Sequence, residues 1–364
     1  MSARTHIPLL LLAVICTLAA CRKDPTLPDE GPVGTPLALE FPVWAQDRSP
    51  LNIPVDNPLT VEGVALGRRL FYETALSDDF SMSCASCHLQ DMNFTDQLAV
   101  SPGVRGFTGR RSAMALVNVG LYNQGLFWDG RSKTLEEQAL LPVEDTLELN
   151  HRWSDVIPEL RQDEDYPRLF RLAFGIKHKD EIDKELAAKA IAQFERTLVS
   201  SGKAKYDRVL RNEDFFTEQE LNGYLMYFDL DPLVPDAECA HCHAHPLFTT
   251  NEYINNGIEK VSDLTGFPDK GRGEVTTRIF DNGRFRVPTL RNVLFTAPFM
   301  HDGRFATIED VIDHYNSGGH QTANKDALIR PLGLTVSQKA DLIAFLKTLS
   351  DSTFLTDPAF SSPF

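Results

Sequence analysis

Two short stretches of the chain place a pair of thiols directly before an imidazole. Both have the spacing CxxCH, in "CASCH" and in "CAHCH". At this spacing the thiols can form thioethers with the vinyl groups of a haem while the following histidine reaches the iron. We therefore predict two covalently bound haem c groups. The residues that hold them are Cys84, Cys87 and His88 in the first and Cys239, Cys242 and His243 in the second.

Other uses of a CxxC pair explain less of this pattern. A thioredoxin-type disulfide requires a strand and a helix around the pair and leaves the histidine without a role. A zinc site built from both pairs requires them to be close in sequence or in one small domain. Two further histidines near the second pair, His241 and His245, are interpreted as surface residues.

The ligand on the other side of each iron decides between electron transfer and chemistry, because only an iron with a vacant position can bind an oxygen species. For the second haem, Met300 in "APFMHDG" and Tyr315 are both candidates. Residues 307–317 have a helical pattern in which Thr307 is the N-cap, Tyr315 shares the apolar face and Gly318 ends the helix. This pattern does not decide between Met300 and Tyr315 as the ligand of the second haem.

The segments that must position these residues are almost all helical. Amphipathic patterns cover residues 61–73, 183–199, 217–228 and 335–349, and a helix precedes each CxxCH as a weak internal repeat. We expect a mainly α protein with two class I cytochrome c-like domains, each carrying one covalent c-type haem. The expected units are a tether and N-terminal arm over residues 21–58, haem domains over 59–205 and 206–350, and a tail over 351–364.

The first twenty residues have the composition of an export signal. Arg4 precedes an apolar run, and the ending "LAAC" resembles a bacterial lipobox, which implies cleavage before Cys21 and a lipid on its thiol. The alternative is an ordinary signal with Cys21 left free. We expect an exported, periplasm-facing or cell-envelope lipoprotein. Without Arg4, 35 basic residues stand against 51 acidic ones, a net charge of −16, which argues against a nucleic-acid partner.

From Leu66 to Leu349 the sequence resembles the bacterial dihaem cytochrome c peroxidase and MauG family. The matching stretches are "LGRRLFYETALS", "SCASCH", "LFWDGRSKTLEEQALLPV", "RFRVPTLRNVLFTAPFMHDGRF" and "DLIAFLKTLS". The resemblance implies a peroxidatic haem in the N-terminal domain and an electron-transfer haem in the C-terminal domain. It is specific for the superfamily and much less so for the substrate.

The resemblance also implies how the two irons differ. The family's second distal ligand, a Met in the peroxidases and a Tyr in MauG, stands nineteen residues after the Thr of "TAP", which here gives Tyr315. The peroxidases carry a displaceable histidine over the first haem, where this chain has Val104. No histidine lies between His88 and His151. We therefore expect a five-coordinate first iron, with Met92 or Met114 as the alternative sixth ligand.

Further site residues are carried over from matched motifs. Gln138 and Glu148 correspond to the amide and the carboxylate that assist cleavage of peroxide, and Trp128 to the indole between the haems. Without the resemblance, we would interpret Glu148 as a solvent-exposed surface acid and Trp128 as a residue that packs in an apolar loop. The family's interhaem calcium ion implies three ligands here: Ser112, in place of an Asn, and the carbonyls of Thr296 and Pro298. His301 and Arg131 lie in matched motifs without an assigned role.

The expected activity is reduction of hydrogen peroxide to water, with electrons delivered through the second haem by a small cytochrome c or cupredoxin. An alternative is MauG-like oxidation of a partner protein residue through a high-valent dihaem state, although the surface Trp that MauG uses is replaced by Ala237. A third reading is a dihaem electron carrier without turnover. The expected cofactors are two haem c groups and a calcium ion, and a homodimer is also considered.

Overall fold

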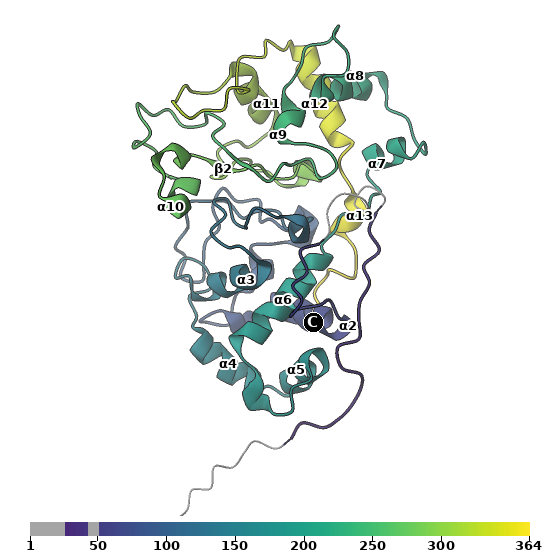
Figure 1. The fold of residues 1–364 in the computed structure, drawn as a ribbon, viewed down its shortest axis with the longest axis vertical. Coiled ribbons are helices and arrows are strands. Elements are labelled where there is room, and N and C mark those ends of the chain that lie inside the picture. Colours follow the sequence, from purple (N-terminus) through teal and green to yellow (C-terminus); the bar gives the residue numbers. More distant parts are fainter. Residues whose placement is uncertain (1–25, 43–50) are drawn as a thin grey trace, which may run out of the picture.

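The computed structural model describes residues 26–42 and 51–364, so the predicted signal, Cys21 and part of the N-terminal arm lie outside the described residues. The fold is mainly helical, as predicted. Figure 1 shows two halves stacked along the long axis of the molecule. Among the described residues, no helix combines the length and the apolar composition needed to cross a membrane.

The first half contains five helices of at least nine residues within the described part. They are α2 (Val61–Phe71), α3 (Leu135–Glu144), α4 (Trp153–Gln162), α5 (Tyr166–Phe174) and α6 (Lys184–Thr197). The second half and the C-terminal segment contain the remaining ones. They are α7 (Lys205–Leu210), α8 (Glu218–Phe228), α9 (Cys239–Cys242), α10 (Arg272–Thr276), α11 (Ile308–Ser317), α12 (Val336–Lys347) and α13 (Ser352–Leu355). Strands β1 (Tyr253–Ile254) and β2 (Phe285–Arg286) pair antiparallel, with Tyr253 opposite Arg286.

The helix starts follow the capping pattern of the sequence. Thr217 and Glu220 form a reciprocal capping box at the start of α8, and Thr335 and Gln338 do the same for α12. These side chains satisfy backbone donors that have no partner within the first turn. The predicted stop of α11 is confirmed, because Gly318 has a φ of 80°, which glycine adopts without steric cost.

The weak sequence repeat corresponds to a repeated helix crossing. Helix α2 packs on α6 in the first half, and α8 packs on α12 in the second. Each crossing contains a glycine: a Cβ on Gly67 would lie 1.8 Å from the Ala190 carbonyl oxygen, and one on Gly223 would lie 2.1 Å from that of Asp341. The absence of a side chain therefore lets each helix pair approach closely.

The C-terminal segment does not stand apart from the two halves. It passes from α12 back to the first half, where α13 lies at the junction in Figure 1. Phe354, Leu355 and Phe360 are buried in the same apolar cluster as Phe71 and Phe94. Three side chains of the segment 351–364, which the sequence analysis describes as a tail, thus contribute to a core cluster of the first half.

Candidate haem sites

Each CxxCH motif lies in a single tight turn at the wall of a cavity. The first occupies a 3-10 turn, Cys84–Ser86, and the second forms α9. The four thiols form no disulfide in the described part of the chain. Burial raises the pKa of Cys87 and of Cys242 to about 11, so that both thiols are protonated at neutral pH.

The two histidines are held in the orientation that a metal ligand needs. Nδ1 of His88 donates to the Phe94 carbonyl oxygen at 2.8 Å, and Nδ1 of His243 to the carbonyl of Pro288 at 3.0 Å. Because Nδ1 carries the proton, Nε2 keeps its lone pair for a metal. Burial lowers the pKa of both imidazoles, that of His243 to about 4, so the neutral, ligating form is present.

A cavity lies next to each of these histidines, measuring about 430 Å³ in the first half and about 180 Å³ in the second. Both are bordered by a CxxCH turn. Two thiols and one imidazole at the wall of each cavity fit a covalently held haem group, which His88 and His243 would bind through the iron.

The first cavity is also lined by the two residues expected to act on peroxide. Gln138 projects from α3, and Glu148 follows in the loop after that helix. His88 is the only imidazole among the described lining residues, and the methionines are Met82 and Met114. The Met114 backbone interacts with the His88 ring itself, while Met92 does not line the cavity among the described residues.

Glu148 is in an environment that favours its neutral form. Burial raises its pKa to about 7 and the nearby Asp145 charge adds to this, whereas Arg131 acts in the opposite direction. The loop with Val104 lies against it, since the Val104 N–H donates to the Glu148 carbonyl oxygen at 2.8 Å. A carboxyl group with a pKa near neutrality can both accept and return a proton.

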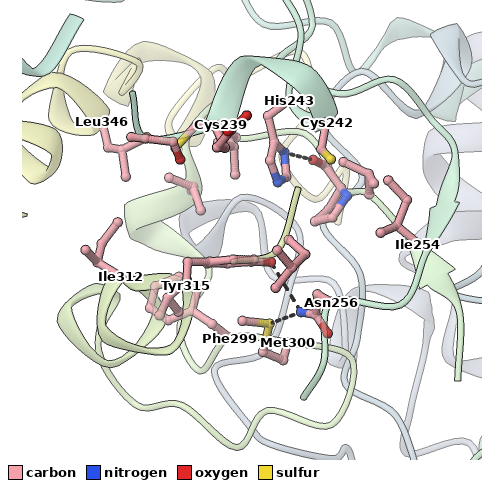
Figure 2. Close-up of a pocket in the computed structure, with 18 of the residues that line it drawn as sticks. Cys239, Cys242, His243, Ile254, Asn256, Phe299, Met300, Ile312, Tyr315 and Leu346 are labelled. Atoms are coloured by element: carbon pink, nitrogen blue, oxygen red, sulfur yellow. Dashed lines mark hydrogen bonds between the residues drawn. The ribbon is translucent and has the colours of Figure 1, made fainter. Parts of the chain in front are cut away.

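The second cavity brings the two candidate distal ligands together. Figure 2 shows His243 on one side and Tyr315, Met300 and Asn256 on the other. The Asn256 amide donates to the Tyr315 hydroxyl at 3.2 Å and contacts the Met300 sulfur at 3.5 Å. Burial raises the pKa of Tyr315 to about 12, and the hydrogen bond from Asn256 opposes this shift.

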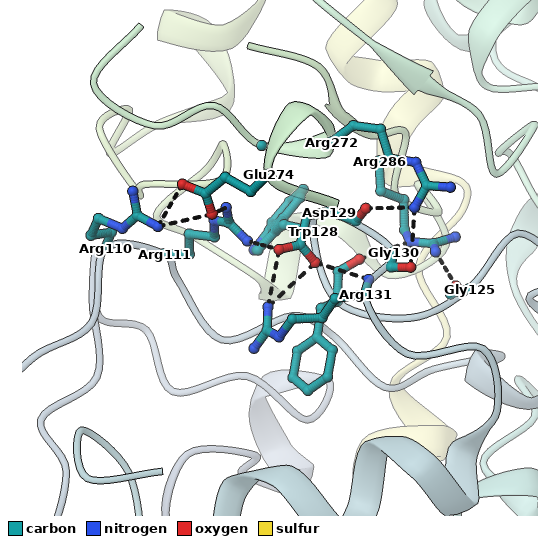
Figure 3. Close-up of polar contacts among 12 residues, drawn as sticks. Arg110, Arg111, Gly125, Trp128, Asp129, Gly130, Arg131, Arg272, Glu274 and Arg286 are labelled. Carbon is teal, nitrogen blue, oxygen red and sulfur yellow. Dashed lines mark hydrogen bonds and ion pairs between the residues drawn. The ribbon is translucent and has the colours of Figure 1, made fainter. Parts of the chain in front are cut away.

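Trp128 lines both cavities and therefore lies between them. Its indole N–H donates to the Ser112 carbonyl oxygen at 2.9 Å, and its own carbonyl accepts from Arg286 of β2. Figure 3 shows the ion pairs around it. The partly buried Arg111 guanidinium joins Asp129 at 2.5 Å to Asp269 at 2.7 Å, which links the two halves beside the indole.

The Ser112 side chain, one of the expected calcium ligands, lies beside the carbonyls of Met300 and His301. The Ser112 hydroxyl donates to the Met300 carbonyl oxygen at 3.0 Å, while that of Thr296 bonds to the Val293 carbonyl. A serine oxygen beside backbone carbonyls is a donor set that calcium accepts. His301 stacks on Phe285 with ring centroids 3.6 Å apart, and Arg131 lies over the Phe127 ring at 3.5 Å.

Two pocket residues were not found from the sequence. Asn256 lies in a loop with no motif, and only its contact with Tyr315 identifies it. Glu195 of α6 lines the first cavity, and its Oε2 atom has no hydrogen-bond partner among the described residues. Burial raises its pKa to about 8. Glu195 could have been found from the sequence, because it is a charged residue on the apolar face of the helix predicted over residues 183–199.

Comparisons with known proteins agree with this geometry. The profile of the di-haem cytochrome c peroxidase family matches residues 61–215. The chain is 32% identical to a cytochrome-c peroxidase, IdrP1, of Denitromonas iodatirespirans over 96% of this chain and 93% of that one. It is 33% identical to the methylamine utilization protein MauG of Methylorubrum extorquens, covering 84% and 83%. The chain belongs to the di-haem cytochrome c peroxidase and MauG family.

Solved structures place the fold in the same family. A MauG-like protein associated with microbial copper homeostasis matches with a TM-score of 0.80 and 35% identity, covering 90% of this chain and 99% of that one. The diheme peroxidase BthA from Burkholderia thailandensis has the same fold, with a TM-score of 0.71 and 24% identity over 84% and 91%. As a member of the di-haem peroxidase family, this chain is an oxidoreductase of the cytochrome-c peroxidase type.

Proposed function

We propose that the protein reduces hydrogen peroxide to water at the haem held by His88, with electrons supplied through the haem held by His243. In this proposal each half is a class I cytochrome c-like domain with a covalent haem c. The supporting observation is the first cavity, where His88, Gln138 and Glu148 line one space without a second imidazole among the described lining residues. A protein that only carries electrons does not need a substrate cavity lined by proton-transferring groups.

A haem held by His88 would supply an iron that can bind peroxide and accept the electrons for its reduction. Glu148 takes a proton from the oxygen nearer the iron and gives it to the departing one, which requires a carboxyl group with a pKa close to the working pH. The Gln138 amide donates a hydrogen bond that orients the bound peroxide. The two electrons and two further protons complete the conversion to two water molecules.

Replacing Glu148 by glutamine tests this assignment. The variant retains the shape but has no basic oxygen, so peroxide consumption by E148Q is expected to fall about 10²–10⁴-fold, the range for loss of a general base. Glu144 is exposed at the end of α3, four residues before Glu148, and E144Q is the matched control.

A spectrum tests whether the first iron has a vacant position. Electron paramagnetic resonance of the oxidised protein should show one high-spin and one low-spin haem. Two low-spin signals with no response to peroxide would support a dihaem electron carrier instead.

A second candidate, oxidation of a residue in a partner protein, is supported by Tyr315. MauG has a tyrosine at this position by the family resemblance, and here the Tyr315 hydroxyl lies in the second cavity. The MauG-like structure that is 35% identical adds to this reading. Ala237 is buried at the position of MauG's surface tryptophan. Oxidation of a partner protein would therefore require electrons to enter this chain by another route. Mass spectrometry of a co-purified partner after peroxide addition tests it.

The remaining assignments concern partners and place. We propose a small cytochrome c or a cupredoxin as electron donor, and an exported, periplasm-facing lipoprotein anchored through Cys21. A calcium ion near Ser112, Thr296 and Pro298 is proposed with backbone carbonyls as its main ligands. Elemental analysis before and after chelation tests the ion, and mass spectrometry of the mature N-terminus tests the lipid.

A further inference from the structure

The side-chain amide of Asn256 lies between the two candidate ligands of the second haem. Its nitrogen is 3.2 Å from the Tyr315 hydroxyl and 3.5 Å from the Met300 sulfur. Both contacts are drawn in Figure 2, where the three side chains meet on the side of the cavity away from His243. One amide group therefore contacts both side chains that could occupy the iron's sixth position.

Asn256 is fixed relative to the helix that carries Tyr315. Its backbone carbonyl accepts a hydrogen bond from His314 Nε2 at 3.0 Å, and His314 is the residue before Tyr315 in α11. The next residue, Gly257, accepts from the His320 N–H at 2.7 Å, just after the end of that helix. These bonds fix the backbone of residues 256 and 257 against α11, the helix that carries Tyr315.

Met300 is held differently. Its backbone has a φ of 77°, and its carbonyl accepts from the Ser112 hydroxyl at 3.0 Å. The side chain has three rotatable bonds, and its sulfur is a weak hydrogen-bond acceptor. The amide therefore holds the Met300 sulfur weakly, while the backbone of this residue is fixed by a contact outside the second cavity.

The amide contact stabilises one ligand more than the other. A hydrogen bond to an anionic oxygen is roughly twice as strong as one between neutral groups, so an N–H donor favours a bound phenolate over a bound thioether. Loss of the donor removes this advantage and leaves the flexible thioether free to move. Tyr315 and Met300 then compete for the sixth position without the bias that the amide gives to the phenolate.

We propose that Asn256 is a positioning residue that assigns the sixth position of the second haem to Tyr315 and keeps Met300 from occupying it. The proposal rests on the haem assignment made for the His243 cavity, but not on peroxide turnover. An oxygen anion on the iron stabilises its oxidised states, whereas a thioether raises the reduction potential. Through this choice of ligand, Asn256 keeps the reduction potential of the second haem low.

The test uses the purified resting holoprotein without peroxide, so it reports on the second haem even if the first one has a different function. In N256L the phenolate-to-iron absorption is expected to be lost, a sulfur-to-iron charge-transfer band to appear, and the midpoint potential to rise. N256D, which keeps the shape without the N–H donor, is expected to behave alike and provides a second variant if N256L folds poorly.

Two further variants separate positioning from general loosening. M300L is expected to keep the spectrum and potential of the unchanged protein, and N256L/M300L to lose the sulfur band. T322V removes the hydroxyl that accepts from Asn255 at 2.9 Å and loosens the same loop without touching either ligand. The proposal is overturned by an unchanged spectrum and potential in N256L and N256D, by loss of the resting ligand signature in M300L, or by an equal change in T322V.

Discussion

At the scale of single residues, the cavity around Glu148 changes what a carboxyl group can do. Burial and the charge of Asp145 together raise its pKa to about 7, although Arg131 acts against them. The same side chain on an exposed loop would be ionised at all physiological pH values. The position within the cavity therefore makes Glu148 suited to accept one proton and return it.

A pH profile tests this environment directly. A raised pKa means that Glu148 is protonated below about pH 7 and cannot accept the peroxide proton there, so peroxide consumption is expected to rise with pH through a midpoint near 7. The dependence should disappear in E148Q and remain in E144Q. Stopped-flow measurement of kcat/KM across this range provides the check, and a midpoint below 5 would mean that Glu148 is exposed in solution.

At the scale of elements, each half depends on one close helix crossing. Gly67 of α2 lies against the Ala190 backbone of α6, and Gly223 of α8 lies against that of Asp341 in α12. A methyl group at either position would contact backbone rather than a movable side chain. The helices that precede each CxxCH are therefore placed by main-chain contact, which fixes the turn that carries the thiols.

Substitution of Gly67 by alanine tests the first crossing. Overpacking usually costs roughly 1–3 kcal/mol, so G67A is expected to lower the free energy of unfolding by at least this amount. G266A is the matched control, because a Cβ there would have its nearest neighbour at 3.5 Å. Urea denaturation of both holoproteins measures the difference. Equal stability of the two variants would show that α2 and α6 can separate without cost.

At the scale of the whole molecule, the two halves are joined by segments that cross between them. The Arg111 ion pairs link Asp129 of the first half to Asp269 of the second, next to Trp128. The C-terminal segment returns to the first half, where Phe354 contacts Phe94 with ring centroids 5.8 Å apart. Both links hold the cavities on either side of the indole in a fixed arrangement.

Truncation of Phe354 tests how much the returning segment contributes. Its side chain is 1% exposed, and Phe→Ala changes in a core cost about 3–5 kcal/mol. F354A is therefore expected to destabilise the first half, although residue 354 follows the second half in sequence. F215A, at a position 83% exposed, is the control. Hydrogen exchange of α2 and α6 locates the effect, and unchanged protection of both helices would contradict it.

Much of the local structure was determined by the sequence itself. The CxxCH turns, the capping boxes of α8 and α12 and the stop at Gly318 depend on residues within a few positions of each other, so short-range spacing is enough to predict them. The mainly helical fold follows from the amphipathic patterns in the same way. Membership of the peroxidase family was visible in motifs spread along most of the chain.

Only the tertiary structure decided which distant residues meet. The contact of Asn256 with Tyr315 and Met300 and the return of Phe354, Leu355 and Phe360 to the first core each join segments far apart in sequence. The raised pKa of Glu148 belongs to this group as well, because burial depends on everything that surrounds a side chain. Local spacing carries no information on such contacts, since long-range packing alone produces them.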